Sequence, residues 1–241
     1  MKLNKKLKYI LSSIGLIGLV VVPTSFVLIS CTENITTSTD GYNTTSNDEI
    51  LKLDFLWNQD DIVGLSEQGK SKENLIVPSF TTSISGLSSA QNPNTTLKTI
   101  NLSKCSKLKS FTFSYCNSLE SIDIPNNITS IDANAFLNCL NLKNVDIVDG
   151  ITSIGPVAFY GCSNLLDICI YKGVKNIGAS AFENCSSLTS ITIPDGVNKF
   201  GVDVFSGNNP TLKIKFSFKE TMDKFLSMNS SWEKYCEVIS N

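Results

Sequence analysis

A repeat of 23 residues is the feature that most constrains this chain. Four segments follow one another at that spacing, beginning at Ile124, Ile147, Ile170 and Ile193. Apolar residues recur in register within them, in the columns Ile128/Ile151/Val174/Val197, Ile131/Ile154/Ile177/Phe200, Ala135/Ala158/Ala181/Val204 and Phe136/Phe159/Phe182/Phe205. Self-similarity at a fixed period of this length indicates a repeat architecture, in which each unit buries its apolar side only by stacking on its neighbours.

A shorter unit of 11 residues precedes the four long ones. Its three copies place Leu97, Leu108 and Leu119 in one column, and residues 75–84 look like a degenerate first coil. These short units keep the strand pattern and lack the long return segment. We therefore expect each of them to add one strand to the same sheet.

The residue types within a unit predict short strands joined by tight turns. In the pattern L-x-x-I-x-I the final residues alternate, so the isoleucines point inward and the residue between them points outward. We expect one short parallel strand per coil, then a second short extended segment such as residues 151–155, and a corner at each Ala-Phe pair. The column Asn127, Gly150, Gly173 and Gly196 predicts a turn with positive φ, which glycine and asparagine adopt most readily.

These motifs resemble the leucine-rich-repeat class called BspA-like or Treponema pallidum type, with the repeat I-P-x-x-V-T-S-I-G-x-x-A-F-x-x-C-x-x-L-x-x-I. The resemblance covers residues 75–216 and implies a leucine-rich-repeat solenoid with a cap at each end. We place a partly helical N-terminal cap at residues 49–74. The C-terminal cap, at residues 217–241, offers a helix and the large side chains of Phe225, Trp232 and Tyr235 to cover the last coil.

The first 30 residues have the layout of a secretory signal peptide. Lysines at positions 2, 5, 6 and 8 precede an apolar run from Tyr9 to Ser30. The run ends at Cys31 and resembles the lipobox of bacterial lipoproteins, which implies a diacylated Cys31 and a protein anchored on the extracellular face of the cell membrane. Two acyl chains suffice for stable anchoring, because each buried methylene contributes about 0.8 kcal/mol. The alternative is an uncleaved transmembrane helix.

Residues 31–48 are rich in Thr, Ser, Asn and Asp, and we interpret them as the lipidated cysteine and a flexible tether. Beyond the signal peptide the chain holds 16 lysines against 22 acidic residues, a formal charge of −6. This balance argues against nucleic acid as a partner, since neutralising phosphates takes clustered basic residues. All the basic residues are lysine and histidine is absent, a composition that resembles surface lipoproteins of mycoplasma-like bacteria.

Cysteine recurs once per unit, at Cys105, Cys116, Cys139, Cys162 and Cys185. In an exported protein this column is open to a disulfide interpretation. The alternative is that each cysteine serves as a small, weakly polar core residue, and we favour it. A zinc site is disfavoured, because the chain has no C-x-x-C pair and no histidine. Cys169 and Cys236 fall outside the column and are the candidate reactive thiols.

The sequence gives little support for catalysis. Without histidine the chain cannot form Ser-His-Asp or Cys-His arrangements, and we identify neither a nucleotide-binding loop nor another cofactor motif. Asp123 and Asp146 hold the same outward position in successive units, which is compatible with the paired carboxylates of a glycosidase. A solvated polar column explains the same two residues.

A binding surface is the better interpretation of the outward column. Extended solenoid faces bind macromolecules, and the resemblance implies adhesion or interaction with host proteins at the cell surface. We expect a protein or glycan ligand, and the resemblance favours an extracellular one of a host. The alternatives are a substrate-binding lipoprotein of a transporter and, less favoured, a carbohydrate-active enzyme. Our candidate contact residues are Asn101, Thr112, Asp123, Asp146, Asp167, Thr192 and Lys215.

Overall fold

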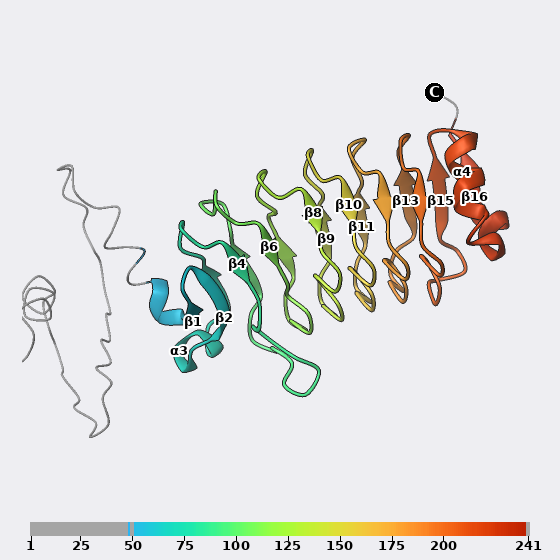
Figure 1. Cartoon of the computed structure of the whole chain (residues 1–241). Helices are drawn as coiled ribbons and strands as arrows, with labels where there is room; N and C mark the ends of the chain where they lie inside the picture. The colour runs from blue at the N-terminus through green and yellow to red at the C-terminus, as the bar shows by residue number, and fades with distance from the viewer. Residues whose placement is uncertain (1–47, 49–50, 240–241) are drawn as a thin grey trace, which may run out of the picture. The chain divides into compact units, whose positions relative to one another are not determined.

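The computed structural model describes residue 48 and residues 51–239, which all belong to one compact unit. The predicted signal peptide, Cys31 and nearly all of the predicted tether lie outside the described residues. The unit is a solenoid of stacked coils, as Figure 1 shows. None of its described helices is long and apolar enough to cross a membrane. The predicted leucine-rich-repeat architecture is confirmed.

Each coil contributes one short strand to either side of the solenoid. On the first side, parallel strands follow the order β11-β9-β7-β5-β3, and β15 pairs in parallel with β13 and β16. We call the outward surface of these strands the strand face. Their bounds are β3 Asn74–Ile76, β5 Thr99–Asn101, β7 Ser121–Ile122, β9 Asn144–Asp146, β11 Asp167–Cys169, β13 Ser190–Ile193, β15 Lys213–Phe216 and β16 Cys236–Val238.

The second side confirms the predicted second extended segment of each coil. Its strands form two sheets, ordered β1-β2-β4-β6 and β14-β12-β10-β8. We call their outward surface the opposite face. The bounds are β1 Phe55–Asn58, β2 Asp61–Leu65, β4 Ser83–Ile84, β6 Ser110–Phe111, β8 Ser130–Ile131, β10 Ser153–Ile154, β12 Asn176–Ile177 and β14 Lys199–Phe200.

The prediction that each 11-residue unit adds one strand to the same sheet is wrong. Strands β5 and β7 pair with each other on the strand face, whereas β6, which lies between them in sequence, pairs with β4 on the opposite face. Two short units therefore make one coil, and each supplies one strand and one corner. The two corners repeat the same hydrogen bonds, since Cys105 N–H donates to Leu102 O at 2.9 Å and Cys116 N–H donates to Phe113 O at 3.0 Å.

A ladder of stacked phenylalanines fills the core along the solenoid axis. Consecutive ring centroids lie 5.1–5.9 Å apart, and all of the rings are fully buried. Offset stacking at this spacing is a favourable arrangement for aromatic pairs. The ladder consists of Phe113, Phe136, Phe159, Phe182 and Phe205. The Ala-Phe motif thus supplies one ring per coil.

The prediction of a positive φ in the turn column is only half correct. In the column Asn127, Gly150, Gly173 and Gly196, only the second and fourth residues have positive φ, at 122° and 86°. Left-handed residues instead recur in two other columns, Tyr115/Asn138/Gly161/Asn184/Gly207 and Asn134/Val157/Ser180/Asp203. The glycine of the Ile-Gly motif is required by close packing between coils and not by its φ. A Cβ on Gly178 would lie 2.3 Å from the Pro156 nitrogen of the previous coil.

The N-terminal cap combines short helices with a hairpin that the sequence did not predict. The helices are η1 (Lys52–Asp54) and α3 (Glu67–Lys70), and β1 pairs with β2 in antiparallel register. The buried Asp54 carboxylate lies 2.7 Å from Lys72 Nζ and accepts a hydrogen bond from Gln68 Nε2. This ion pair ties η1 to the segment that follows α3.

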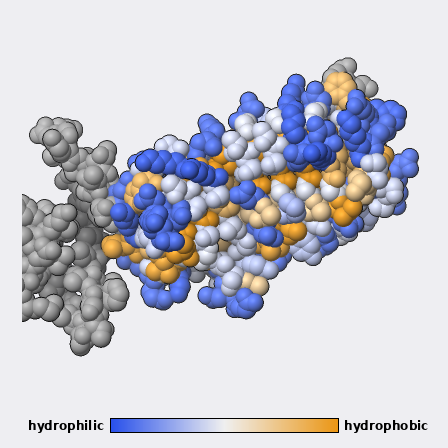
Figure 2. Space-filling model, in the orientation of Figure 1, coloured by the Kyte–Doolittle hydropathy of each residue, from blue (hydrophilic) through white to orange (hydrophobic). Residues whose placement is uncertain are grey.

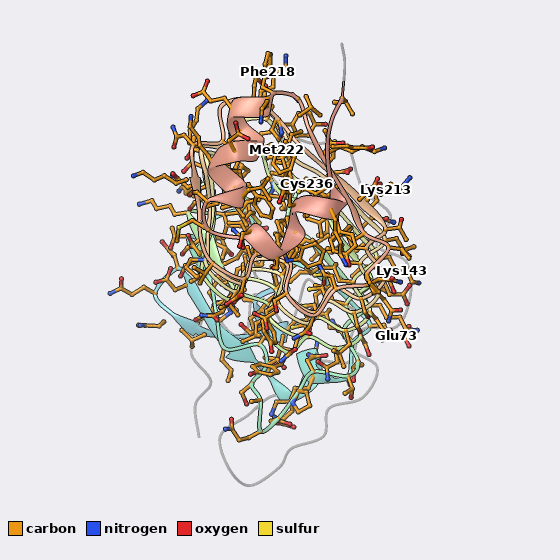
Figure 3. The ribbon with its side chains drawn as sticks, turned by 90° about the vertical axis from the view of Figure 1, so that its right-hand side faces the viewer. Glu73, Lys143, Lys213, Phe218, Met222 and Cys236 are labelled. Carbon is orange, nitrogen blue, oxygen red and sulfur yellow. The ribbon has the colours of Figure 1, made fainter. Side chains whose placement is uncertain are left out.

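The C-terminal cap closes the core with aromatic side chains. Helix α4 (Lys219–Leu226) and η2 (Ser230–Tyr235) precede β16 and lie over the end of the solenoid (Figure 3). Phe225 is fully buried, with its ring centroid 5.5 Å from that of Phe216 and 5.8 Å from that of Phe205. Trp232 packs edge-on against Phe205. The end of the phenylalanine ladder is therefore covered.

Candidate binding surface

The outward residues of the strand face form a ladder across successive coils. Residues 101, 123, 146 and 169 follow one another in register, because Ile100 pairs with Ile122, Ile122 with Val145, and Cys169 with Asp146. Thr192 pairs with Lys215 farther along. All of these side chains are exposed except that of Lys215, which is half-buried. The structure therefore brings together the predicted contact residues Asn101, Asp123, Asp146, Thr192 and Lys215.

Asp167 lies on the same face, two residues before Cys169 of the outward ladder. It pairs with Asn144, and its Oδ1 accepts a hydrogen bond of 2.9 Å from the Ile168 N–H. Thr112 is the exception among the candidates. It follows β6 on the opposite face, where its hydroxyl lies 2.8 Å from that of Ser114. The prediction that Thr112 belongs to this ladder is wrong, because the 11-residue units alternate between the two faces.

A second ladder, of alternating charges, was not predicted. It occupies the residue just before each strand, at Glu73, Lys98, Glu120 and Lys143. Lys98 Nζ lies 2.9 Å from Glu73, and Lys143 Nζ lies 2.8 Å from Glu120. The sequence signal is a charged residue of alternating sign directly after Leu97, Leu119 and Leu142, visible once the short units are read in pairs. Figure 3 shows Glu73, Lys143 and Lys213 on the same side of the solenoid.

These ion pairs perturb the titration of their members. The hydrogen bond with Glu73, together with its charge, raises the pKa of Lys98. The hydrogen bond from Lys143, together with its charge, lowers the pKa of Glu120. All four groups are solvent-exposed or nearly so, and salt screens such pairs. The four charges therefore neutralise one another at the surface and contribute little to the stability of the fold.

A sequence profile described as "BspA type Leucine rich repeat region" matches six consecutive copies over residues 87–212. This match spans more than half of the chain. The chain belongs to the BspA-type leucine-rich-repeat family. No curated protein matches it in sequence.

Solved structures with the same repeats agree in fold. A leucine-rich cell-surface protein from Faecalibacterium prausnitzii has 29% identity and a TM-score of 0.52, over 61% of this chain and 39% of that one. A Treponema pallidum leucine-rich-repeat protein has 23% identity and a TM-score of 0.51, over 64% of this chain and 86% of that one. A leucine-rich-repeat protein from Eubacterium ventriosum, at 19% identity, has a TM-score of 0.51 over 64% of this chain and 48% of that one. This chain thus spans well under two thirds of the first and third proteins.

The repeat cysteines are free and buried, and they have a common role in the BspA-type coil. The thiols of Cys139, Cys162 and Cys185 each lie 3.1 Å from the carbonyl of the phenylalanine 26 residues earlier. The last coil replaces cysteine by Asn208, whose amide donates to the equivalent carbonyl of Phe182 at 3.0 Å. Each residue satisfies a buried acceptor between coils, which favours the core interpretation over disulfides.

Cys105 is misplaced in the predicted column. It lies at the other corner of its coil, 3.7 Å from the carbonyl of Val77, because the short units alternate between corners. Of the two candidate reactive thiols, Cys169 is exposed on the strand face. Cys236 is half-buried 3.2 Å from the Trp232 carbonyl, and burial raises its pKa to about 11.

The paired carboxylates have no enclosed site around them. Asp123 borders a shallow hollow of about 460 Å³ that Ser103, Ser106, Asn126 and Asn127 also line. Asp123 and Asp146 both remain exposed. Among the described residues no group of three or more His, Cys, Asp or Glu side chains is placed to hold a metal ion. This geometry suits the recognition of a partner across an open surface.

Proposed function

We propose that this chain is a cell-surface binding protein, anchored by a lipid on Cys31, that binds a protein or glycan partner on its strand face. BspA-type leucine-rich-repeat proteins are associated with the cell surface, and leucine-rich-repeat proteins typically bind other proteins. The observation that carries the proposal is the open ladder of Asn101, Asp123, Asp146 and Thr192. It combines an extended surface with side chains that hydrogen-bond to a partner.

The strand face supports this role better than the opposite face does, because most of its strands are three or four residues long, whereas β4, β6, β8, β10, β12 and β14 of the opposite face have two residues each. From β3 to β11 its outward residues come from consecutive coils in register, so one partner contacts several coils at once. Leucine-rich repeats are scaffolds whose specificity depends on surface side chains, so the fold alone does not name the ligand. Adhesion to an extracellular protein or glycan of a host is the role we infer, and we assign no catalytic residue.

A binding screen with matched charge variants tests the proposed surface. The full chain, solubilised in mild detergent, is assayed against matrix proteins, plasma proteins and glycans by surface plasmon resonance. Asp123→Lys combined with Asp146→Lys should weaken binding strongly. Asp60→Lys makes the same kind of charge change in the turn between β1 and β2, beside the opposite-face sheet, and should leave it unchanged. Equal binding by the wild type and both variants would show that the strand face is not the binding surface.

The anchor is tested separately. Metabolic labelling with a radioactive or alkynyl fatty acid should mark the wild-type chain, and membrane fractionation should place it in the pellet. Cys31→Ala should abolish the label and release the protein. Retention of both label and membrane association by the variant would exclude Cys31 as the acylated residue, whereas a wild-type chain that pellets with the membrane without label would favour an uncleaved transmembrane helix.

A further inference from the structure

The charged ladder of the strand face ends abruptly at the fifth of its strands. Glu73, Lys98, Glu120 and Lys143 occupy four consecutive coils, and the next residue in that column is Leu166. Its side chain is 55% exposed, the largest exposure among the described large hydrophobic residues. A leucine this exposed has no role in the core, since Leu165 beside it is the buried member of the pair.

Two further side chains of low polarity follow Leu166, at the end of β11 and just after it. Cys169, the last residue of β11, and Tyr171 point outward in alternation with the buried Ile168 and Ile170, and Tyr171 is 44% exposed. At about 3.3 Å per residue, Leu166 and Tyr171 span about 16 Å along the chain. We call Leu166, Cys169 and Tyr171 the apolar strip. Tyrosine is enriched in binding hot spots, and a patch of exposed apolar side chains marks a candidate interaction site.

The sheet of the strand face is also interrupted beside this strip. Before each of β5, β7, β9 and β11, the residue ahead of the strand donates its N–H to the previous coil, as Leu166 does to Lys143 O at 2.9 Å. Thr189 makes no such bond to Leu166 O, and no ladder joins β11 to β13 although the two strands lie side by side. The strip therefore lies at the edge of the five-stranded sheet.

The charge around the strip is negative. Asp167 lies on the coil of the strip and Asp146 and Asp149 lie on the preceding coil, and all three side chains are exposed. Lys143 is engaged with Glu120, so Lys172 and Lys175 of these two coils stand against three aspartates. A partner that covers the strip therefore gains from positive charge beside its apolar contact.

We infer that the apolar strip is the docking site for an extended segment of a protein partner, with an apolar or aromatic side chain flanked by Lys or Arg. The apolar side chain packs over Cys169, between the side chains of Leu166 and Tyr171, and the basic residues face the aspartates. This inference rests on the proposed function of the strand face and names the partner's chemistry.

Cys169 supplies a local reporter for the test. Its thiol is exposed, while the thiols of the repeat column are buried. The rate of its alkylation by iodoacetamide in the full chain is measured by mass spectrometry, without and with blocked peptides. The peptide Gly-Lys-Phe-Lys-Gly should slow alkylation saturably. The charge-reversed Gly-Glu-Phe-Glu-Gly and the apolar-deleted Gly-Lys-Ser-Lys-Gly should leave the rate near that of the free chain.

Two variants and a control locate the effect. Leu166→Ser and Tyr171→Ser should each weaken protection about tenfold, because each removes a central apolar contact. Leu140→Ser changes a leucine of comparable exposure, 39%, at a corner outside the strip, and should not alter it. Thermal unfolding confirms that all three variants remain folded.

The outcomes separate this inference from the proposed function. Equal protection by all peptides, or protection by neutral phosphatidylcholine vesicles and by no peptide, would overturn it. A partner from the binding screen that is sensitive to Asp123→Lys and Asp146→Lys but leaves Cys169 unprotected would also overturn it, while the strand face would stand as the binding surface.

Discussion

At the scale of single residues, left-handed backbone conformations affect local stability, and the repeat pattern does not reveal them. Residues 134, 157, 180 and 203 all have φ between 54° and 61°, and only the first is asparagine, which tolerates this region well. Val157 is β-branched and is strained there. Its apolar character agrees with the neighbouring core columns, so the residue type does not indicate the left-handed turn.

Val157→Asn should therefore stabilise the protein. Relief of the left-handed strain is worth about 1–2 kcal/mol, and the loss of a half-buried apolar side chain offsets part of it. Chemical denaturation of the two chains measures the difference, with a net gain of about 1 kcal/mol expected. Asn134→Val places the strain in the preceding coil and should lower stability. A destabilised Val157→Asn chain would refute this explanation.

The buried thiols predict a loss of stability in alkaline solution. Burial raises the pKa of Cys116 and of Cys185 to about 12, and the pKa of Cys139 and of Cys162 well above the ordinary range. The unfolded thiols ionise near pH 8.5, whereas the folded ones keep their protons. Stability is thus fully present below about pH 8.5 and falls as the pH rises toward 12, by about 1.4 kcal/mol per pH unit for each thiol.

The free energy of unfolding, measured as a function of pH, tests this effect. Lysines and tyrosines also titrate at alkaline pH, so the comparison is with Cys139→Ala, which lacks one thiol. The free energy of unfolding of that variant should fall less steeply with pH, by the contribution of one thiol, about 1.4 kcal/mol per pH unit. Parallel curves for the two chains would show that Cys139 ionises equally in the folded and unfolded states.

At the scale of elements, stacking of coils does not bury the core at the two ends of the solenoid. The terminal coil has a neighbour on one side only, so α4 must cover its core. Phe225 does this from within the helix, against Phe200, Phe205 and Phe216. The large side chains after the last repeat predicted this cap from sequence. The β1–β2 hairpin at the other end was not predicted, because its apolar residues lack a clear period.

Phe225→Ala should loosen the C-terminal end first. Removing a fully buried phenylalanine costs about 3–5 kcal/mol, and hydrogen exchange should rise in β15 and β16 before it rises in β9 or β11. Phe218→Ala is the matched control, since this ring is 50% exposed just before the same helix. Uniform acceleration across all coils would indicate that the solenoid unfolds as one cooperative unit.

The pairing of the short units marks the limit of what the sequence predicted. The 23-residue columns placed Ile131, Phe136 and their equivalents correctly, because a full-length repeat returns each residue to the same face. An 11-residue unit is half a coil, so successive copies fall on opposite faces. The sequence pattern of the two halves is nearly identical, and it does not by itself distinguish a half coil from a short whole one.

At the scale of the whole molecule, the solenoid presents two long surfaces of different character. The strand face carries the paired charges, the outward ladder and the apolar strip in successive coils. Figure 2 shows one side of the solenoid, with hydrophobic residues spread along its length between hydrophilic ones, which gather near both ends. Most of the outward ladder could be predicted from sequence, since strand alternation fixes it. The interruption of the sheet between β11 and β13 could not, since no residue type encodes it.

The most direct test of the account is hydroxyl-radical footprinting of the full chain with the partner that the binding screen identifies. We expect protection of Ile76, Cys169 and Tyr171, the exposed side chains of the strand face that react readily with the radical, and unchanged reactivity of Leu56 and Val63 on β1 and β2 of the opposite face. Protection of the second set alone would contradict the claim that this solenoid binds its partner through the strand face.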